Sequence, residues 1–421
     1  MARLSWAVPA AVLVAALVAC APAARPPTEA ELGPGPGLSD HVVDGPVSLR
    51  LPDGTEAVPT SVALASARVA VEGGDYTVLS RTPADDTLLG LDVLPTGDLV
   101  ALRVPENQYQ GGDGVAVSSV LGTYDGHRFD PWPGTGRLVP GDPPRQVYGA
   151  DAGQGAVAWA ETASIRLDRS SWRVFARDDA GRTSLVATSE EVIDGPMPVL
   201  NDDARPVVAD GRVYWATPAP AGPGSDQLQM QVVSRDIGGG GPLTVGARGA
   251  ARPAVGDHGV YVVRTYRDDP TVPDGRSVVA VATGGGDTAP LLTVDGPPGV
   301  NVVDLVADGS RLAFVTSAPS FSTGTVYVHD PVSGRLVAVP TAGAGQRTEL
   351  ALCGDRLVWT TNDGSGVGAG SVFVLDVATL DLREVEVQGG YGTVMCAGDV
   401  VAWQALPSPD GFATTTVVRW G

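Results

Sequence analysis

The stretch Ala-Arg-Pro-Val-Val-Ala-Asp-Gly-Arg-Val-Tyr-Trp, residues 204–215, decides the fold of this chain. A short apolar run leads into the dipeptide Asp210-Gly211, and a Val-x-aromatic run follows it. Asp-Gly readily adopts the positive φ angles that a tight hairpin needs. The stretch therefore predicts two antiparallel strands joined by a two-residue turn.

Similar phrases recur along the chain at intervals of about 50 residues. Most copies precede a third strand that ends in a turn, such as Val326–Gly334, and a fourth strand, such as Leu336–Val339. Four antiparallel strands in a repeat of about this length are typical of a β-propeller blade. Seven copies predict an all-β propeller of seven blades, the other six lying at 96–102, 153–159, 251–262, 306–314, 353–359 and 396–403.

The two ends of the chain are expected to close the ring together. The last repeat supplies strands at 394–396, 400–404 and 414–420, and then the chain stops without a fourth strand. The strand-like region Val47–Leu79, with candidate strands at Val47–Leu51, Arg68–Val71 and Tyr76–Leu79, is expected to complete that blade. The alternative is an eighth, degenerate blade centred on 69–71. Closure would remove exposed sheet edges.

The repeats resemble the broad WD40-like, YVTN-like and TolB-like propeller group over nearly all of residues 43–421. The resemblance rests on the Asp-x-x-x-Gly turn after the third strand, seen at Asp330 and Gly334. No repeat carries the Gly-His and Trp-Asp pairs of strict WD40 proteins. The resemblance implies the propeller fold and leaves the function open.

The first 19 residues have the features of a signal peptide. Arg3 precedes an apolar run from Leu4 to Ala19, which has the length of a signal-peptide core. The run ends in Leu17-Val18-Ala19-Cys20, which resembles a bacterial lipobox, so Cys20 is the expected site of lipidation. The alternative is a plain secretory signal that ends near a cysteine.

Residues 20–42 are rich in Pro and Gly and are expected to form a tether between the lipidated cysteine and a propeller body at 43–421. Such a composition cannot bury enough apolar surface to fold. We therefore expect an exported protein, anchored through lipid to the outer face of the bacterial cytoplasmic membrane. We also expect a monomer.

The charge of the chain argues against nucleic acid as a partner. The formal net charge is -20, with 48 acidic residues against 28 basic ones, all of which are Arg. Such a charge repels phosphate backbones.

Two further cysteines, Cys353 and Cys396, stand at near-equivalent places, each at the end of the innermost strand of adjacent blades. In an oxidising compartment such a pair can form a disulfide, if the two residues meet the narrow geometry of the bond. The alternative is two small buried hydrophobic side chains.

The loops between the second and third strands carry acidic and aromatic residues that are expected on one face of the ring. Such a face suits a protein, peptide or glycan ligand, whereas the plainer interpretation is solvated turns. The acidic run 268–274 superficially resembles a calcium loop, but its spacing is not that of an EF-hand. No other cofactor is expected. The candidate binding residues are Tyr109, Asp113, Asp226, Tyr266, Asp268, Asp269, Asp274, Phe321, Asp363, Asp410 and Phe412.

No catalytic residue can be assigned from motifs, because the chain lacks His-Glu-x-x-His, Cys-x-x-Cys and Gly-x-Ser-x-Gly. The preferred hypothesis is a non-catalytic binding or scaffold module. The alternative is an extracellular hydrolase or lyase with carboxylates in the central funnel, acting with or without a Ca²⁺ ion. The two hypotheses differ in one observable. An enzyme should bring three or more carboxylates with shifted pKa values within a few ångströms of one another at the mouth of the channel, whereas scattered, solvated acidic residues would favour binding.

Overall fold

The structure is a computed structural model that describes residues 47–104, 119–135, 138–139, 145–162, 171–193, 205–222, 224–317, 324–341, 349–362, 369–388, 393–405 and 413–421. All of these belong to one compact unit, Val43–Gly421. Within these ranges no helix has the length and apolar character needed to cross a membrane. Two short 3-10 turns are described in full, Leu64–Ser66 and Ser189–Glu191.

The described strands form seven sheets, each with four antiparallel strands that we number as one blade. Blades one to three contain β5 (Leu88–Val93), β6 (Leu99–Arg103), β7 (Val120–Tyr124), β8 (Phe129–Pro131); β9 (Gln146–Gly153), β10 (Ala156–Thr162), β11 (Trp172–Asp178), β12 (Thr183–Thr188); and β13 (Val207–Ala209), β14 (Arg212–Pro220), β15 (Leu228–Asp236), β16 (Thr244–Arg248). Blades four and five contain β17 (Ala251–Gly256), β18 (Gly259–Thr265), β19 (Arg276–Gly284), β20 (Asp287–Asp295); and β21 (Asn301–Asp308), β22 (Arg311–Ser317), β23 (Gly324–Asp330), β24 (Arg335–Pro340). Blades six and seven contain β25 (Leu350–Cys353), β26 (Arg356–Asn362), β27 (Ala369–Asp376), β28 (Leu382–Gln388); and β29 (Val394–Ala397), β30 (Val400–Ala405), β31 (Thr414–Trp420), β4 (Tyr76–Arg81).

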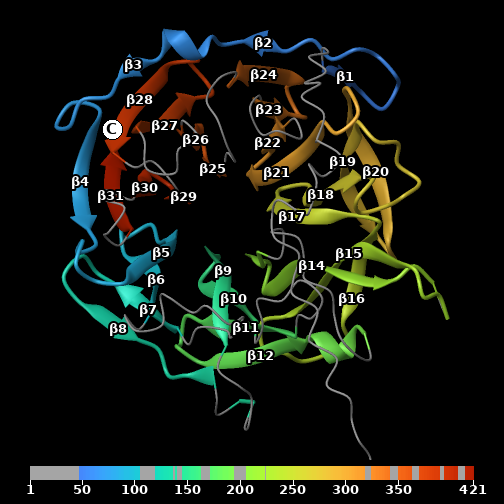
Figure 1. Cartoon of the computed structure of the whole chain (residues 1–421), viewed down its shortest axis with the longest axis horizontal. Helices are drawn as coiled ribbons and strands as arrows, with labels where there is room; N and C mark the ends of the chain where they lie inside the picture. Colours follow the sequence, from blue (N-terminus) through green and yellow to red (C-terminus); the bar gives the residue numbers. More distant parts are fainter. Residues whose placement is uncertain are drawn as a thin grey trace, which may run out of the picture. The chain divides into compact units, whose positions relative to one another are not determined.

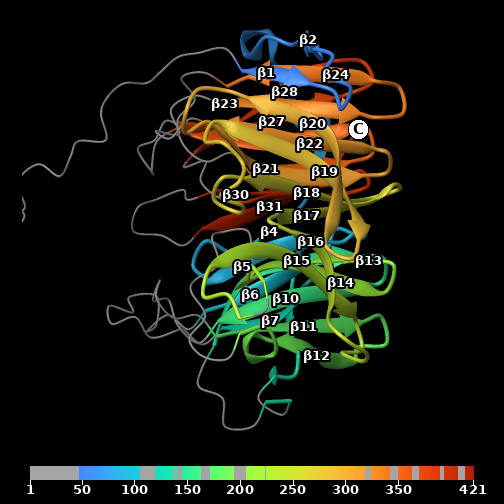
Figure 2. The same ribbon diagram turned by 90° about the vertical axis from the view of Figure 1, so that its right-hand side faces the viewer.

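The seven blades form a ring, which confirms the predicted propeller. The first strand of each blade contacts the first strand of the next all the way round, from β5 through β9, β13, β17, β21 and β25 to β29 and back to β5. Figure 1 shows these strands around the centre of the ring, and Figure 2 shows the same sheets edge-on. There is no eighth blade in the described part of the chain.

The repeated phrase builds the inner hairpin of each blade as its turn chemistry predicts. In blade three Asp210 and Gly211 have φ angles of 50° and 70°, and Ala209 pairs with Arg212 across the turn. In blades two, five and six the aromatic residue of the phrase pairs with another aromatic on the third strand. The stacked pairs are Trp159–Phe175, Phe314–Tyr327 and Trp359–Phe373, with ring centroids 4.9 to 5.6 Å apart. Such cross-strand pairs stabilise the sheet.

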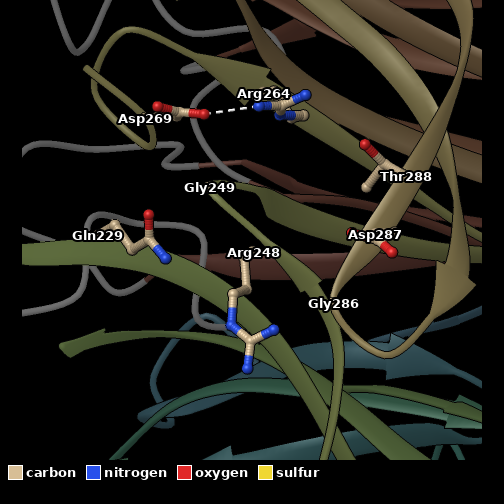
Figure 3. Close-up of a pocket in the computed structure, with 8 residues that line it drawn as sticks. All are labelled: Gln229, Arg248, Gly249, Arg264, Asp269, Gly286, Asp287 and Thr288. Carbon is tan, nitrogen blue, oxygen red and sulfur yellow. Dashed lines mark hydrogen bonds and ion pairs between the residues drawn. The ribbon is translucent and has the colours of Figure 1, made fainter. Parts of the chain in front are cut away.

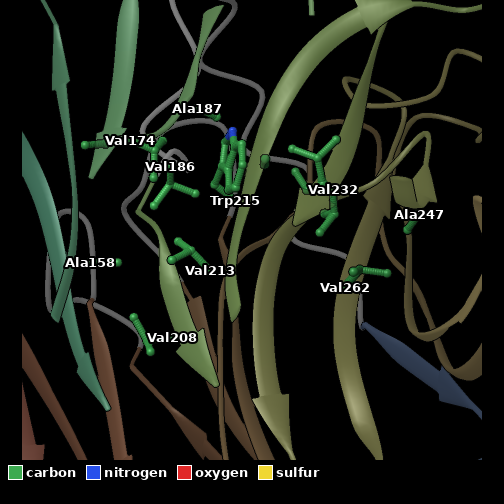
Figure 4. Close-up of a cluster of buried hydrophobic side chains, with 14 of the residues drawn as sticks. Ala158, Val174, Val186, Ala187, Val208, Val213, Trp215, Val232, Ala247 and Val262 are labelled. Carbon is green, nitrogen blue, oxygen red and sulfur yellow. The ribbon is translucent and has the colours of Figure 1, made fainter. Parts of the chain in front are cut away.

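The hydrophobic core lies between blades rather than in one central mass. The largest cluster contains side chains from blades two, three and four, including Trp172 and Trp215, whose rings meet edge to face at 5.8 Å. Figure 4 shows Trp215 among the small side chains Val186, Val213 and Val232. Because each sheet buries both faces against its neighbours, the blades depend on an intact ring.

The ring is closed by the pairing of β31 with β4, so the two ends of the propeller share blade seven. The Thr415 backbone N–H donates to Thr82 Oγ1 at 2.8 Å, and the Thr82 N–H donates to the Thr415 carbonyl at 2.9 Å. At the opposite end of the same strand pair the ring of Tyr76 stacks on Trp420, with ring centroids 5.6 Å apart. The prediction that terminal strands close the ring is confirmed.

The prediction that the whole region Val47–Leu79 completes blade seven is wrong, because only β4 does so. The strands before it pair with the outer edges of three other blades: β1 (Ser48–Arg50) with β20, β2 (Thr60–Ser61) with β24 and β3 (Arg68–Val69) with β28. The outer edge of a sheet offers unpaired backbone groups, and this segment covers three such edges in succession. Figure 1 shows it, in blue, along the rim from blade four to blade seven.

A disulfide joins Cys353 at the end of β25 to Cys396 in β29, so it links blades six and seven beside the ring centre. Their Cα atoms lie 6.0 Å apart, within the usual range for the bond. The bond closes a segment of 43 residues. It therefore ties blade six directly to the blade that closes the ring.

We expect the double substitution Cys353→Ser and Cys396→Ser to lower the free energy of unfolding by about 2–4 kcal/mol, because the unfolded chain regains the freedom that the bond removes. Urea denaturation would measure this loss, with Cys20→Ser as a control that leaves stability unchanged. In the Cys20→Ser variant, unfolded without reductant, we expect no free thiol. Two free thiols there would contradict the bond.

Candidate functional site

Two aspartates stand on neighbouring inner strands among mostly apolar residues. Asp92 in β5 accepts a hydrogen bond from the backbone N–H of Ala152 in blade two, at 2.6 Å. Asp151 in β9 accepts one from the N–H of Val208 in blade three, at 2.8 Å. Each carboxylate thus joins its own blade to the inner strand of the next.

Asp304 in β21 makes the same kind of link between blades five and six. Its Oδ2 accepts the N–H of Leu350 at 2.9 Å, and its Oδ1 accepts the N–H of Leu305 at 2.9 Å. Glu349 immediately precedes Leu350 and interacts electrostatically with Asp304. Both residues are half-buried.

One arginine stands among these carboxylates. Arg205, just before β13, donates from Nε to the carbonyl of Ala150 at 3.1 Å and from Nη2 to the carbonyl of Leu91 at 3.5 Å. Its charge interacts with four carboxylates, those of Asp92, Asp151, Glu349 and Asp304. Charged side chains from blades one, two, three, five and six therefore converge on the ring centre.

Burial is the main cause of the pKa shifts in this cluster. Burial and the nearby charge of Glu349 together raise the pKa of Asp304 to about 6, against the opposing effects of the Leu350 backbone N–H and of Arg205. Burial also raises the pKa of Asp92 and of Asp151, again opposed by Arg205. For Arg205, burial opposes protonation, but the carboxylates outweigh it and hold its pKa above the ordinary value.

The cluster can hold protonated and ionised carboxyl groups together near neutral pH. A carboxyl group with a raised pKa can donate a proton, while an ionised neighbour can accept one. Three carboxylates near the ring centre, those of Asp92, Asp151 and Asp304, thus have raised pKa values, a property often found at catalytic sites.

The acidic side chains in the loop of blade four all bond to neighbouring groups of the protein. Asp268 accepts bonds from the N–H and hydroxyl of Thr265 at 3.0 and 2.8 Å. Asp269 pairs with Arg264 at 2.6 Å, and Asp274 accepts the N–H of Gly299 at 2.9 Å. In the ranges that the structure covers, no group of three or more His, Cys, Asp or Glu could hold a metal ion.

The other candidate binding residues are scattered or not described. Asp226 is exposed, and the half-buried Tyr266 accepts a hydrogen bond from Nε of its neighbour Arg267 at 3.2 Å. The lipidation candidate Cys20 and six loop residues lie outside the described residues, the six being Tyr109, Asp113, Phe321, Asp363, Asp410 and Phe412. Of the described candidates, four share the loop between β18 and β19, and Asp226 lies in the loop between β14 and β15.

Motif searching missed the residues at the ring centre because it looked in loops. A usable signal was present, since Asp92 in Gly-Leu-Asp-Val and Asp304 in Val-Val-Asp-Leu each interrupt an apolar run that leads into an inner hairpin. A charged residue at such a position is rarely buried without a partner. Which of these residues meet across the ring depends on the closed fold.

The chain matches solved structures but no family. No family model matches it, and no curated protein does either. It is similar to a puromycin-hydrolysing peptidase of Mycobacterium tuberculosis, with 18% identity, a TM-score of 0.47, and 80% of this chain and 53% of that chain covered. It is also similar to a prolyl endopeptidase, with 13% identity, a TM-score of 0.48, and 79% of this chain and 50% of that chain covered. A third similar structure is an α-L-arabinanase of Penicillium chrysogenum, with 13% identity, a TM-score of 0.38, and 82% of this chain and 98% of that chain covered. The chain spans about half the length of these peptidases.

The prediction of a non-catalytic binding or scaffold module disagrees with the kind of protein that these similar structures represent. The similar structures are those of hydrolases, two peptidases and an arabinanase, and the hydrolase alternative agrees better with them. At such low identity the likeness itself establishes the fold alone. The case for an activity in this chain must therefore rest on the carboxylates at the ring centre.

We expect the folded protein to lose stability as the pH rises from about 4 to about 7. The pKa of Asp304, about 6, lies above its ordinary value of 3.8, so in this window the folded state holds a proton that the unfolded state releases. The stabilisation is fully present below about pH 4 and is lost as the pH passes the folded-state pKa. Urea denaturation at several pH values would show this slope.

The variant Asp304→Asn cannot titrate at this position, so its stability should fall less steeply over the same window. Asp179→Asn, at an exposed position, should keep the slope of the original protein. Equal slopes for the original protein and Asp304→Asn would mean that the pKa of Asp304 is not raised.

Proposed function

We propose that the protein is a hydrolase in which Asp304 and Glu349 act as general acid and general base. The observation that carries the proposal is a half-buried carboxyl group with a pKa of about 6 beside a second carboxylate at the ring centre. A proton donor of this pKa suits catalysis near neutral pH. Paired carboxylates with different pKa values are the groups that cleave acetals in many glycosidases.

The reaction needs no group beyond the chain and water. Protonated Asp304 gives its proton to the oxygen of the leaving group as the bond to that oxygen breaks. Glu349 takes a proton from a water molecule, whose oxygen forms the new bond to the substrate carbon. The bond to the leaving-group oxygen is thus cleaved, and each of the two products carries a hydroxyl group. Proton transfer from Glu349 back to Asp304 through solvent then restores the starting state.

A glycosidic bond is the linkage that this pair suits best, because acetal cleavage needs only a proton donor and a base. A peptide bond is the second candidate, since carboxyl groups that share a proton also activate water towards amides. Arg205 would act as a positioning residue here. Its charge offsets part of the repulsion among the surrounding carboxylates and so keeps them together.

We further propose that the enzyme works outside the cytoplasm. The support is the lipobox-like sequence ending at Cys20 and the Pro/Gly-rich segment 20–42. A lipidated Cys20 would hold the propeller at the outer face of the cytoplasmic membrane, on a tether, with envelope glycans or peptides within reach. Metabolic labelling with a fatty-acid analogue, with Cys20→Ser as the unlabelled control, would test the anchor.

We expect Asp304→Asn and Glu349→Gln each to reduce kcat/KM by about 10²–10⁴-fold, because each removes a proton-transfer group. The assay uses purified protein and panels of envelope glycans and peptides, with and without Ca²⁺. Matched controls are Asp179→Asn and Glu386→Gln, both at exposed positions away from the ring centre. Full activity in either centre variant, or turnover of no member of either panel, would contradict the proposal.

A further inference from the structure

Arg252 has a backbone conformation that is rare in a strand. Its φ angle is 52°, in the left-handed region that L-residues seldom adopt. The other described non-glycine residues with a positive φ, which are Gln154, Asp210 and Leu380, all lie in turns between strands. Arg252 instead lies within β17, the first strand of blade four. Such strain persists only where the surrounding structure holds it, and it clusters at functional sites.

The strained residue lies in a bulge that directs its side chain to the next blade. Residues 251–254 of β17 lie opposite residues 261–263 of β18, so the inner strand has one extra residue there. Bulges re-aim side chains and are common beside active sites. The half-buried Arg252 side chain crosses from blade four to blade five, where its Nε donates to the Val303 carbonyl at 2.9 Å.

Val303 is itself the extra residue of a bulge. Residues 302–304 of β21 lie opposite residues 315–316 of β22. The peptide unit that joins Val303 to Asp304 is planar, so a bond to its carbonyl restrains the orientation of the whole unit. Arg252 thus restrains the chain immediately before Asp304, the proposed proton donor.

Asp304 is held by contacts from three blades. The N–H of Leu305, the next residue in blade five, donates to Oδ1, and the N–H of Leu350 in blade six donates to Oδ2, both at 2.9 Å. Arg252 of blade four restrains the residue before it. Because Glu349 directly precedes Leu350, the place of the Asp304 carboxyl group relative to Glu349 depends on these three contacts.

Blade one contains the same arrangement. Residues 90–92 of β5 lie opposite residues 100–101 of β6, so Leu91 is the extra residue of a bulge. Arg205 donates to the Leu91 carbonyl at 3.5 Å, and Asp92, which follows Leu91, accepts a backbone N–H from the next blade at 2.6 Å. In both blades an arginine binds the carbonyl of a bulged residue, and an aspartate bonded to the following blade comes next. This recurrence links the arginine contact to the placing of the aspartate.

We propose that Arg252 is a positioning residue for the hydrolysis and acts through the Val303 carbonyl to keep Asp304 in its place near Glu349. The inference rests on the proposed function, yet the placing of Asp304 can be measured without a substrate. Arg252 acts through its hydrogen bond, since Arg205 is the cation whose charge acts on the pKa of Asp304. Without that bond the Val303 peptide unit can turn, and the Asp304 carboxyl group becomes more exposed to water.

The pKa of Asp304, measured by NMR in the full-length protein, tests the proposal. The carboxyl signal is identified by its absence in Asp304→Asn. Burial is the main cause that raises this pKa, to about 6, so greater exposure should lower it toward the ordinary value of 3.8. We expect this fall in Arg252→Gly and in Arg252→Met, because neither side chain can donate a hydrogen bond to the Val303 carbonyl.

The choice of variants separates positioning from a merely structural role. Glycine accepts a positive φ without strain, so Arg252→Gly removes the hydrogen bond while it relieves the backbone. Arg252→Lys keeps a donor that can reach the Val303 carbonyl, and the pKa of Asp304 should stay near 6. Thermal unfolding identifies any variant that fails to fold. An unchanged pKa in folded Arg252→Gly or Arg252→Met would overturn the proposal, as would an equal fall in Arg252→Lys.

Arg248 provides the matched control. It also bonds to a backbone carbonyl, because its Nη1 donates to Gly285 at 3.0 Å. It lies at the end of β16, the outer strand of blade three, and Figure 3 shows it beside Gly286 in the lining of a pocket away from the ring centre. Arg248→Met should leave the pKa of Asp304 at about 6. An equal fall in Arg248→Met would show that the effect is not specific to Arg252 and would contradict the proposal.

A kinetic test follows once the glycan and peptide panels identify a substrate. Arg252→Gly should lower kcat by about 10–10²-fold and change KM less, because a misplaced proton donor slows the chemical step more than it weakens binding. Full kcat in folded Arg252→Gly would contradict the proposal. Turnover of no substrate by the original protein would instead refute the proposed hydrolysis, and the pKa of Asp304 would still decide whether Arg252 places that residue.

Discussion

The pairing of β31 with β4 is the interaction on which the rest of the structure depends. Every blade buries both faces against its neighbours, so an open ring would expose apolar faces at both ends. The link between Thr82 and Thr415 supports this closure from within blade seven. The disulfide from Cys353 to Cys396 supports it from blade six. These contacts offset the conformational entropy that the chain loses when its two ends are brought together to close the ring.

Closure also creates the site. Asp92 and Asp304 belong to blades on different sides of the ring, and Arg205 interacts with both only because the inner strands meet around one centre. Each aspartate also accepts a backbone N–H from the following blade. The same carboxylates therefore serve the fold and the proposed chemistry. A group that is held in place by backbone donors is well ordered, which catalysis requires.

The fold could be predicted from the sequence because its signals are local. A turn such as Asp210-Gly211, together with the Val-x-aromatic run that follows it, specifies one hairpin. The number of times this phrase recurs in the sequence gives the number of blades. The pairing of β1, β2 and β3 with the outer edges of three other blades could not be predicted, since strands of two or three residues leave no periodic pattern in the sequence. The site escaped prediction for another reason: the bond between Asp92 and Ala152 joins residues 60 positions apart on neighbouring blades, and Arg205 interacts with Asp304 and Glu349 two and three blades further along the chain.

We propose Asp304 at the ring centre as a proton donor in hydrolysis. The pH dependence of kcat/KM on the substrate identified from the glycan and peptide panels tests it most directly. We expect a bell-shaped profile that falls on its alkaline side with an apparent pKa near 6, and a loss of that alkaline limb in Asp304→Asn. A profile that stays level from pH 5 to pH 8, or an alkaline limb retained in Asp304→Asn, would contradict it.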